Sequence, residues 1–147
     1  MWFSHSTETT APPRRVWDVW TTVEQWPTWD TELREATLDG EFCEGATGEL
    51  TPRRGRATSF VVTDVDPVRS YTYVADLPLA RLVVRRSLHS HDGGTNFTHE
   101  VWFEGPLGRV FSRTLGRHYR HALPQVMEAV REQAEASHAT GSSTDVA

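Results

Sequence analysis

The last third of the sequence predicts one long amphipathic helix that directly follows a β-hairpin. The hairpin is expected to turn at residues 92–95 and the helix to run from Pro106 to Glu135. A helix of about thirty residues measures about 45 Å, which is longer than a small domain needs for ordinary packing. Gly116 and the kink-forming Pro124 lie inside it. A long, bent helix over a curved sheet tends to enclose space, and enclosed space suggests a ligand.

The segments before this helix read as strands and short helices. Residues 2–9 alternate like an opening strand, a helix is predicted over residues 12–22, and a shorter one over residues 23–29. Six more strands, separated by turn residues, are predicted at residues 32–39, 46–53, 57–65, 69–77, 80–91 and 95–104. Strands joined by short turns form an antiparallel sheet, and helices kept to one face give an α+β fold.

Composition restricts the class of function. The net charge of −5 argues against a nucleic-acid or anionic-membrane surface. A single cysteine, Cys43, excludes an internal disulfide and fits a reducing compartment. The sequence shows no signal peptide and no apolar run near the ~20 residues of a membrane span. We expect one soluble, cytoplasmic domain over residues 1–136, monomeric or homodimeric, followed by a disordered tail over residues 137–147.

Hairpin register predicts which side chains share the face beneath the long helix. A two-residue turn at Gly93-Gly94 pairs Arg86 with Val101, and a second hairpin turns at Pro78-Leu79. With a further turn at Asp66-Pro67, these hairpins place on one face Phe60, Val62, Tyr71, Tyr73, Val84, Arg86, Leu88, Phe97, His99 and Val101. For the strand over residues 46–53 the turn length is ambiguous, which leaves open whether the inward residue is Glu49 or Leu50.

An apolar stripe on the long helix faces this inner surface. Its members recur at three- and four-residue steps and are Val110, Phe111, Leu115, His118, Ala122, Val126 and Val130. The stripe brings His118 to Arg86 and His99 in an apolar interior. Burying such groups without partners costs several kcal/mol. They therefore satisfy each other and the tyrosines, or a polar ligand or water satisfies them.

We interpret the inner-face residues, together with Phe111, Leu115 and His118, as candidate ligand-binding residues. Arg86 and His99 are the candidate catalytic pair, because an arginine can hold a carboxylate or enolate oxygen while a histidine moves a proton near neutral pH. No cofactor and no metal site are predicted. His89 and His91 share one side of a strand, but that side faces away from His99 and offers no third ligand.

Several motifs together resemble a known superfamily. Residues 16–20 (VWDVW) and 26–30 (WPTWD) look like an opening helix pair, and residues 94–99 (GTNFTH) followed by 105–107 (GPL) are similar in kind and order to later elements. On these grounds the chain resembles the SRPBCC (START-like, helix-grip) superfamily and, within it, the polyketide cyclase/dehydrase-like branch. The resemblance implies a seven-stranded curved sheet that grips the C-terminal helix around a hydrophobic cavity.

Three functions remain open at this point. The first is binding of a small hydrophobic molecule, aromatic or polyketide-like, in the cavity between sheet and helix. The second is a metal-free polyketide aromatase/cyclase or dehydratase that uses general acid/base chemistry in that cavity. The third is a protein-interaction module whose cavity is nearly filled. The superfamily includes lipid carriers, hormone receptors and aromatase/cyclases, so the fold does not choose among these functions.

Overall fold

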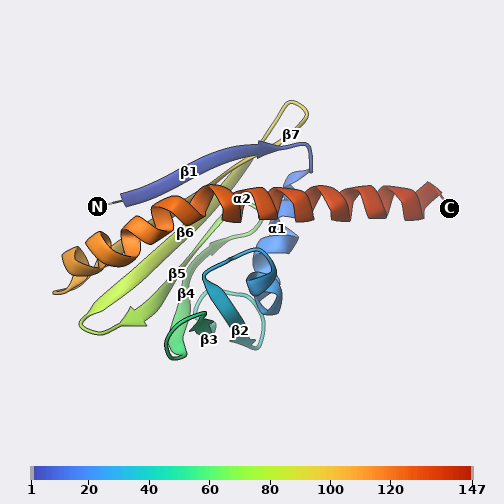
Figure 1. The fold of residues 1–147 in the computed structure, drawn as a ribbon. Coiled ribbons are helices and arrows are strands. Elements are labelled where there is room, and N and C mark those ends of the chain that lie inside the picture. Colours follow the sequence, from blue (N-terminus) through green and yellow to red (C-terminus); the bar gives the residue numbers. More distant parts are fainter. Residues whose placement is uncertain (1, 147) are drawn as a thin grey trace.

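A seven-stranded antiparallel sheet curves beneath one long helix, α2 (Gly108–Val146), in this computed structural model (Figure 1). The structure describes the backbone of residues 2–146 and the side chains of residues 2–136. The strand order is β1-β7-β6-β5-β4-β3-β2. The strands are β1 (Trp2–Thr9), β2 (Leu33–Asp39), β3 (Thr47–Pro52), β4 (Thr58–Asp66), β5 (Ser70–Leu77), β6 (Ala80–His91) and β7 (Gly94–Glu104).

Two short helices connect the edge strands β1 and β2. They are α1 (Pro13–Thr21) and the 3-10 helix η1 (Val23–Thr28), of which α1 packs on α2 and η1 on β2. Proline occupies the start of α1, where its missing N–H costs nothing. The predicted α+β helix-grip fold is therefore confirmed, and each strand end lies within one residue of its predicted position.

The end of α2 differs from the sequence prediction. The helix continues to Val146, whereas the sequence predicts an end at Glu135 and a disordered tail over residues 137–147. The side chains of that tail lie outside the described residues. The division into a domain over residues 1–136 and a separate tail stays a prediction.

The predicted register of the β6–β7 hairpin is wrong by two residues. The turn residues are Asp92 and Gly93, and Gly94 is already part of β7. The observed pairs are Leu88 with Phe97, Arg86 with His99 and Val84 with Val101. A shift of two residues preserves the alternation of faces, so the residues predicted on the inner face still lie there. The predicted β5–β6 register is confirmed.

On the β3 strand, the structure resolves the alternative that the sequence leaves open. Leu50 points into the core and Glu49 is exposed. On β4, Phe60 and Val62 are buried as predicted. The inner face of the sheet is thus apolar from β3 to β7, apart from a few polar residues near its centre.

The predicted inner stripe of α2 is correct in its second half and wrong in its first. Ala122, Val126 and Val130 are buried, but Val110 and Leu115 are exposed and Phe111 is half-buried. Small residues face the sheet instead, because a Cβ at Gly116 would lie 2.4 Å from the ring of Phe3 on β1. Close packing of α2 on β1 thus turns His118 outward.

Gly94 provides a test of the close approach of β1 to β7, because a Cβ there would lie 1.9 Å from the backbone carbonyl oxygen of Thr9. Gly94→Ala is expected to lower the free energy of unfolding by about 3 kcal/mol, since the β1 backbone has to move. At Gly93, φ is 88° and no atom lies within 4 Å of an added Cβ. Gly93→Ala should therefore cost about 1–2 kcal/mol. Urea denaturation of both variants measures the difference, and equal costs would contradict the close contact between β1 and β7.

Candidate functional site

A buried arginine occupies the centre of the inner face. Arg86 of β6 is 2% exposed. Its Nη1 donates to the hydroxyl of Tyr71 at 2.5 Å, and its Nη2 lies 3.9 Å from Oδ2 of Asp30. The guanidinium carbon lies 4.7 to 5.7 Å from the ring centroids of Trp26, Trp29, Tyr71 and Tyr73. Aromatic faces at this range attract a desolvated cation.

Arg86 keeps its charge in this environment. Burial opposes the charge, but the neighbouring Tyr71, Tyr73 and Asp30 together raise the pKa of Arg86. Burial in turn raises the pKa of Asp30, against the opposing effect of Arg86. The Asp30 carboxylate also accepts a hydrogen bond from the backbone N–H of Glu32 at 3.0 Å.

His99 lies beside Arg86 on the neighbouring strand β7 and is 1% exposed. Its Nε2 accepts a hydrogen bond from the indole N–H of Trp20 at 3.1 Å. Burial, and then the charges of Arg86 and His5, hold the pKa of His99 well below its usual value. His99 is therefore neutral, and because Nε2 is the acceptor, Nδ1 carries the proton.

Some hydrogen-bond donors of the interior have no partner. Within the described residues, Arg86 Nε and Trp29 Nε1 are buried without a hydrogen-bond partner. Nδ1 of His99 is a third available donor. An unpaired buried donor costs about 1–3 kcal/mol. The centre of the protein is thus suited to an acceptor atom from a ligand or a water molecule.

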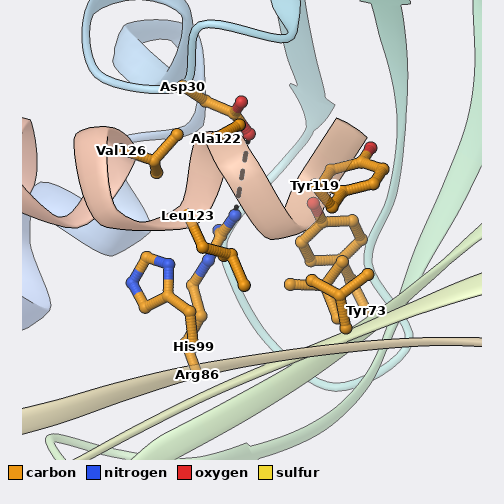
Figure 2. Close-up of a pocket in the computed structure, with 10 residues that line it drawn as sticks. Asp30, Tyr73, Arg86, His99, Tyr119, Ala122, Leu123 and Val126 are labelled. Carbon is orange, nitrogen blue, oxygen red and sulfur yellow. Dashed lines mark ion pairs between the residues drawn. The ribbon is translucent and has the colours of Figure 1, made fainter. Parts of the chain in front are cut away.

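The space next to these donors is small. A cavity of about 20 Å³ lies between the sheet and α2, and a space of this size holds about one water molecule (Figure 2). Its lining residues are Asp30, Tyr73, Val84, Arg86, His99, Val101, Tyr119, Ala122, Leu123 and Val126. Ligand pockets usually measure about 300–1,000 Å³. The space between the sheet and α2 is therefore too small for a ligand in this structure, and the predicted ligand cavity stays a prediction.

About half of the lining residues are among the ligand-binding residues predicted from the sequence. The predicted residues that line the cavity are Tyr73, Val84, Arg86, His99 and Val101. Others are buried in the surrounding core, namely Phe60, Val62, Tyr71, Leu88 and Phe97. A ligand-binding role for either group stays a prediction.

The predicted convergence of His118 with Arg86 and His99 is wrong. The His118 side chain is 66% exposed, and its Nε2 lies 2.8 Å from Oε2 of Glu32 near the surface. Phe111 and Leu115 do not line the cavity either. The reason is that the first half of α2 packs on the sheet with its small residues and not with the apolar stripe predicted from the sequence.

The lining residues that the sequence analysis missed are Asp30, Tyr119 and Leu123. A buried arginine requires a carboxylate or several acceptors nearby, and this requirement was the available signal for an acidic partner. Asp30 meets it from the loop between η1 and β2, far from Arg86 in sequence. Tyr119 lies one turn after Gly116, so the correct helix face would have identified it.

Within the described residues, three other features bear on function. No group of three or more His, Cys, Asp or Glu side chains is arranged to hold a metal ion there. Cys43 is exposed. Among the helices of the described chain, none combines the length and the apolar character that crossing a membrane requires.

Comparison with known proteins supports the family resemblance over nearly the whole chain. The model of the family described as "Polyketide cyclase / dehydrase and lipid transport" matches residues 3–135. No curated protein matches the chain.

Solved structures of similar fold include three informative ones. Protein MLL2253 from Mesorhizobium loti has a TM-score of 0.71 at 20% identity, over 92% of this chain and 98% of that chain. Protein NE0264 from Nitrosomonas europaea has a TM-score of 0.72 at 15% identity, over 95% and 97%. DynU16, described as a putative protein in the dynemicin biosynthetic locus, has a TM-score of 0.70 at 16% identity, over 92% of this chain and 48% of its own. At these identities the likeness shows the fold.

The lowered pKa of His99 predicts acid sensitivity. Below pH 6.5 the unfolded chain protonates this histidine and the folded protein does not. Stability is therefore complete above pH 6.5 and falls as the pH decreases, by up to about 1.4 kcal/mol per pH unit. His99→Gln should show less of this fall between pH 6.5 and 5, measured by urea denaturation. The exposed His121→Gln is the control, and an equal fall in His99→Gln would contradict a buried neutral His99.

The buried tyrosines predict the opposite behaviour at high pH. Burial raises the pKa of Tyr71 to about 12, although Arg86 lowers it, and burial also raises the pKa values of Tyr73 and Tyr119. Stability from Tyr71 is complete below pH 10 and is lost as the pH rises toward 12. Absorbance at 295 nm should show little tyrosinate in the folded protein at pH 10.5 and much more in urea. Equal tyrosinate signals would show that the tyrosines are accessible.

Proposed function

Because the chain belongs to the polyketide cyclase/dehydrase and lipid-transport family, we propose that it binds a small, largely apolar molecule between the sheet and α2. The molecule has a hydrogen-bond-accepting end, such as a carbonyl, phenolate or carboxylate. The observation that carries this proposal is Arg86, a buried cation whose Nε has no acceptor and whose carboxylate partner Asp30 is 3.9 Å away. A ligand oxygen at this position satisfies the unpaired donor and compensates the charge.

The surrounding groups fit such a ligand. Apolar side chains of the sheet and of α2 supply contact area, and the aromatic rings around Arg86 suit a flat or aromatic molecule. His99 adds a neutral donor through Nδ1, so a single oxygen atom can accept from both residues. A few polar groups in an apolar pocket are the usual arrangement for orienting a small ligand.

Binding requires the closed cavity to open. α2 packs extensively on β1, β7 and α1. Toward β2, its contacts include the ion pair from His118 to Glu32 and a hydrogen bond from Gln133 to Thr28. Both contacts are on the surface and contribute little to stability individually. Movement of α2 away from the η1–β2 segment, which also carries Asp30, therefore enlarges the cavity without breaking a strong polar contact, and its main cost is the exposure of apolar surface.

A second candidate function is the cyclase or dehydratase. Arg86 is suited to hold a developing enolate oxygen in an environment without water. In this state, however, His99 donates through Nδ1 and its Nε2 is occupied by Trp20. His99 acts as a general base only if the Trp20 indole turns away, so the geometry supports binding better than catalysis. The small cavity favours the third candidate, a protein-interaction module. Such a module does not explain why buried donors of the interior have no hydrogen-bond partner.

The test compares 2-naphthoate with 2-methylnaphthalene, which has the same size without the acceptor. Titrations followed by tryptophan fluorescence and calorimetry should show roughly tenfold tighter binding of naphthoate, since hydrogen bonds to charged groups contribute about 1.5–3 kcal/mol. Asp30→Asn removes the competing carboxylate and should strengthen naphthoate binding. The double variant Asp30→Asn/Arg86→Met should lose the preference, while Arg85→Met, on the opposite face of β6, should keep it.

Two results would overturn the proposed function: neither compound binds saturably, or the preference for naphthoate persists in the double variant. Circular dichroism and urea denaturation establish that each variant is folded. Catalysis is tested separately by incubating the protein with polyketide-like compounds and analysing products by mass spectrometry. Turnover that is lost in His99→Ala, with binding retained, would favour the enzyme.

A further inference from the structure

Four polar side chains form a row across the inner face of the sheet. His5 of β1 lies opposite His99 of β7, His99 lies opposite Arg86 of β6, and Arg86 lies opposite Tyr71 of β5. Directly opposite residues in neighbouring strands point to the same face. The row therefore leads from the edge strand β1 to the closed cavity. In the core around it, the face is mainly apolar.

A second hollow lies where this row reaches the edge of the sheet. It occupies about 210 Å³ between β1 and α2. Its walls are Trp2, Phe3, Ser4, His5, Arg120, Leu123 and Pro124. Pro124 has no N–H to donate to the Arg120 carbonyl, and such an interruption bends a helix. α2 visibly changes direction along its length beside β1 (Figure 1).

Leu123 belongs to both hollows. It lines the closed cavity together with Arg86 and His99, and it lines the hollow at β1 together with His5 and Arg120. Figure 2 shows its side chain pointing from α2 toward the strands, next to Arg86. The other lining residues of the two spaces differ, so Leu123 is the side chain that they share.

We propose that the hollow between β1 and α2 is an outer subsite of the interior site, and that the ligand is an elongated molecule with a carboxylate at its outer end. This inference rests on the proposed function and adds a ligand class to it. The inner acceptor end binds at Arg86, the apolar middle replaces the contacts of Leu123, and the outer carboxylate binds at Arg120 and His5. Arg120 supplies a planar guanidinium that matches a carboxylate with two hydrogen bonds.

The geometry favours a ligand with two polar ends over a fully apolar one. Each lining combines polar with apolar side chains, with Arg86 and His99 in the closed cavity and Arg120 and His5 in the hollow at β1, and Leu123 belongs to both. A flexible chain with one carboxylate occupies the inner end alone. A chain with a carboxylate at each end occupies both, and the second charge-assisted contact adds affinity.

The experiment compares decanoate with decanedioate, two flexible chains of equal length, in calorimetric titrations. Decanedioate is expected to bind the unmodified protein roughly tenfold more tightly. Arg120→Gln should remove this preference. Arg117→Gln, an exposed arginine one turn earlier on α2 that does not line the hollow, should retain it.

The possible outcomes separate the two proposals. If decanoate binds and loses affinity in Asp30→Asn/Arg86→Met, but decanedioate has no advantage or keeps it in Arg120→Gln, then the outer subsite is wrong and the proposed function stands. If neither chain binds while 2-naphthoate does, the outer subsite is overturned and the proposed function stands; if 2-naphthoate does not bind either, both proposals are overturned. A preference for decanedioate that depends on Arg120 and not on Arg117 supports the outer subsite.

Discussion

The burial of one cation determines the arrangement of the interior. Arg86 lies at the centre of an apolar sheet face, where a charge without partners is strongly destabilising. Its compensation comes from many sources: a tyrosine hydroxyl, a distant carboxylate and four aromatic faces. These partners come from β5, η1 and the loop that follows η1, so one guanidinium connects elements that are remote in the chain. The compensation is incomplete, because Arg86 Nε has no hydrogen-bond partner, and the proposed ligand would supply the missing acceptor.

The closed cavity lowers the apparent affinity expected for a ligand. A ligand that requires an opened interior binds with an apparent affinity reduced by the small population of the open state. Opening exposes tryptophan and tyrosine rings that now pack around Arg86, which costs hydrophobic free energy. Weak binding in a first titration therefore reflects the closed equilibrium as well as the contacts in the site. Ligands with a larger apolar surface recover more of this cost.

The sequence predicted the elements well because strands and turns leave local signals. Alternation and turn residues located all seven strands, and the β5–β6 hairpin gave the correct register from local geometry. The β6–β7 hairpin was wrong by two residues, because the close approach of Thr9 on β1 keeps Gly94 in the strand and no local pattern reports a third strand. The face of α2 was wrong for a similar reason, since small residues that allow close packing do not appear in a hydrophobic stripe. Asp30 was missed because its partner is distant in sequence.

The pairing of the first strand with the last has a consequence for biosynthesis. β1 pairs with β7, and α2 covers both after them in the chain. Contacts between such distant segments form late and slow the folding of a domain. A nascent chain that ends before Gly108 lacks the cover over Arg86, which then stays hydrated. Under the proposed function, ligand capture therefore begins only after the ribosome has released the C-terminal helix.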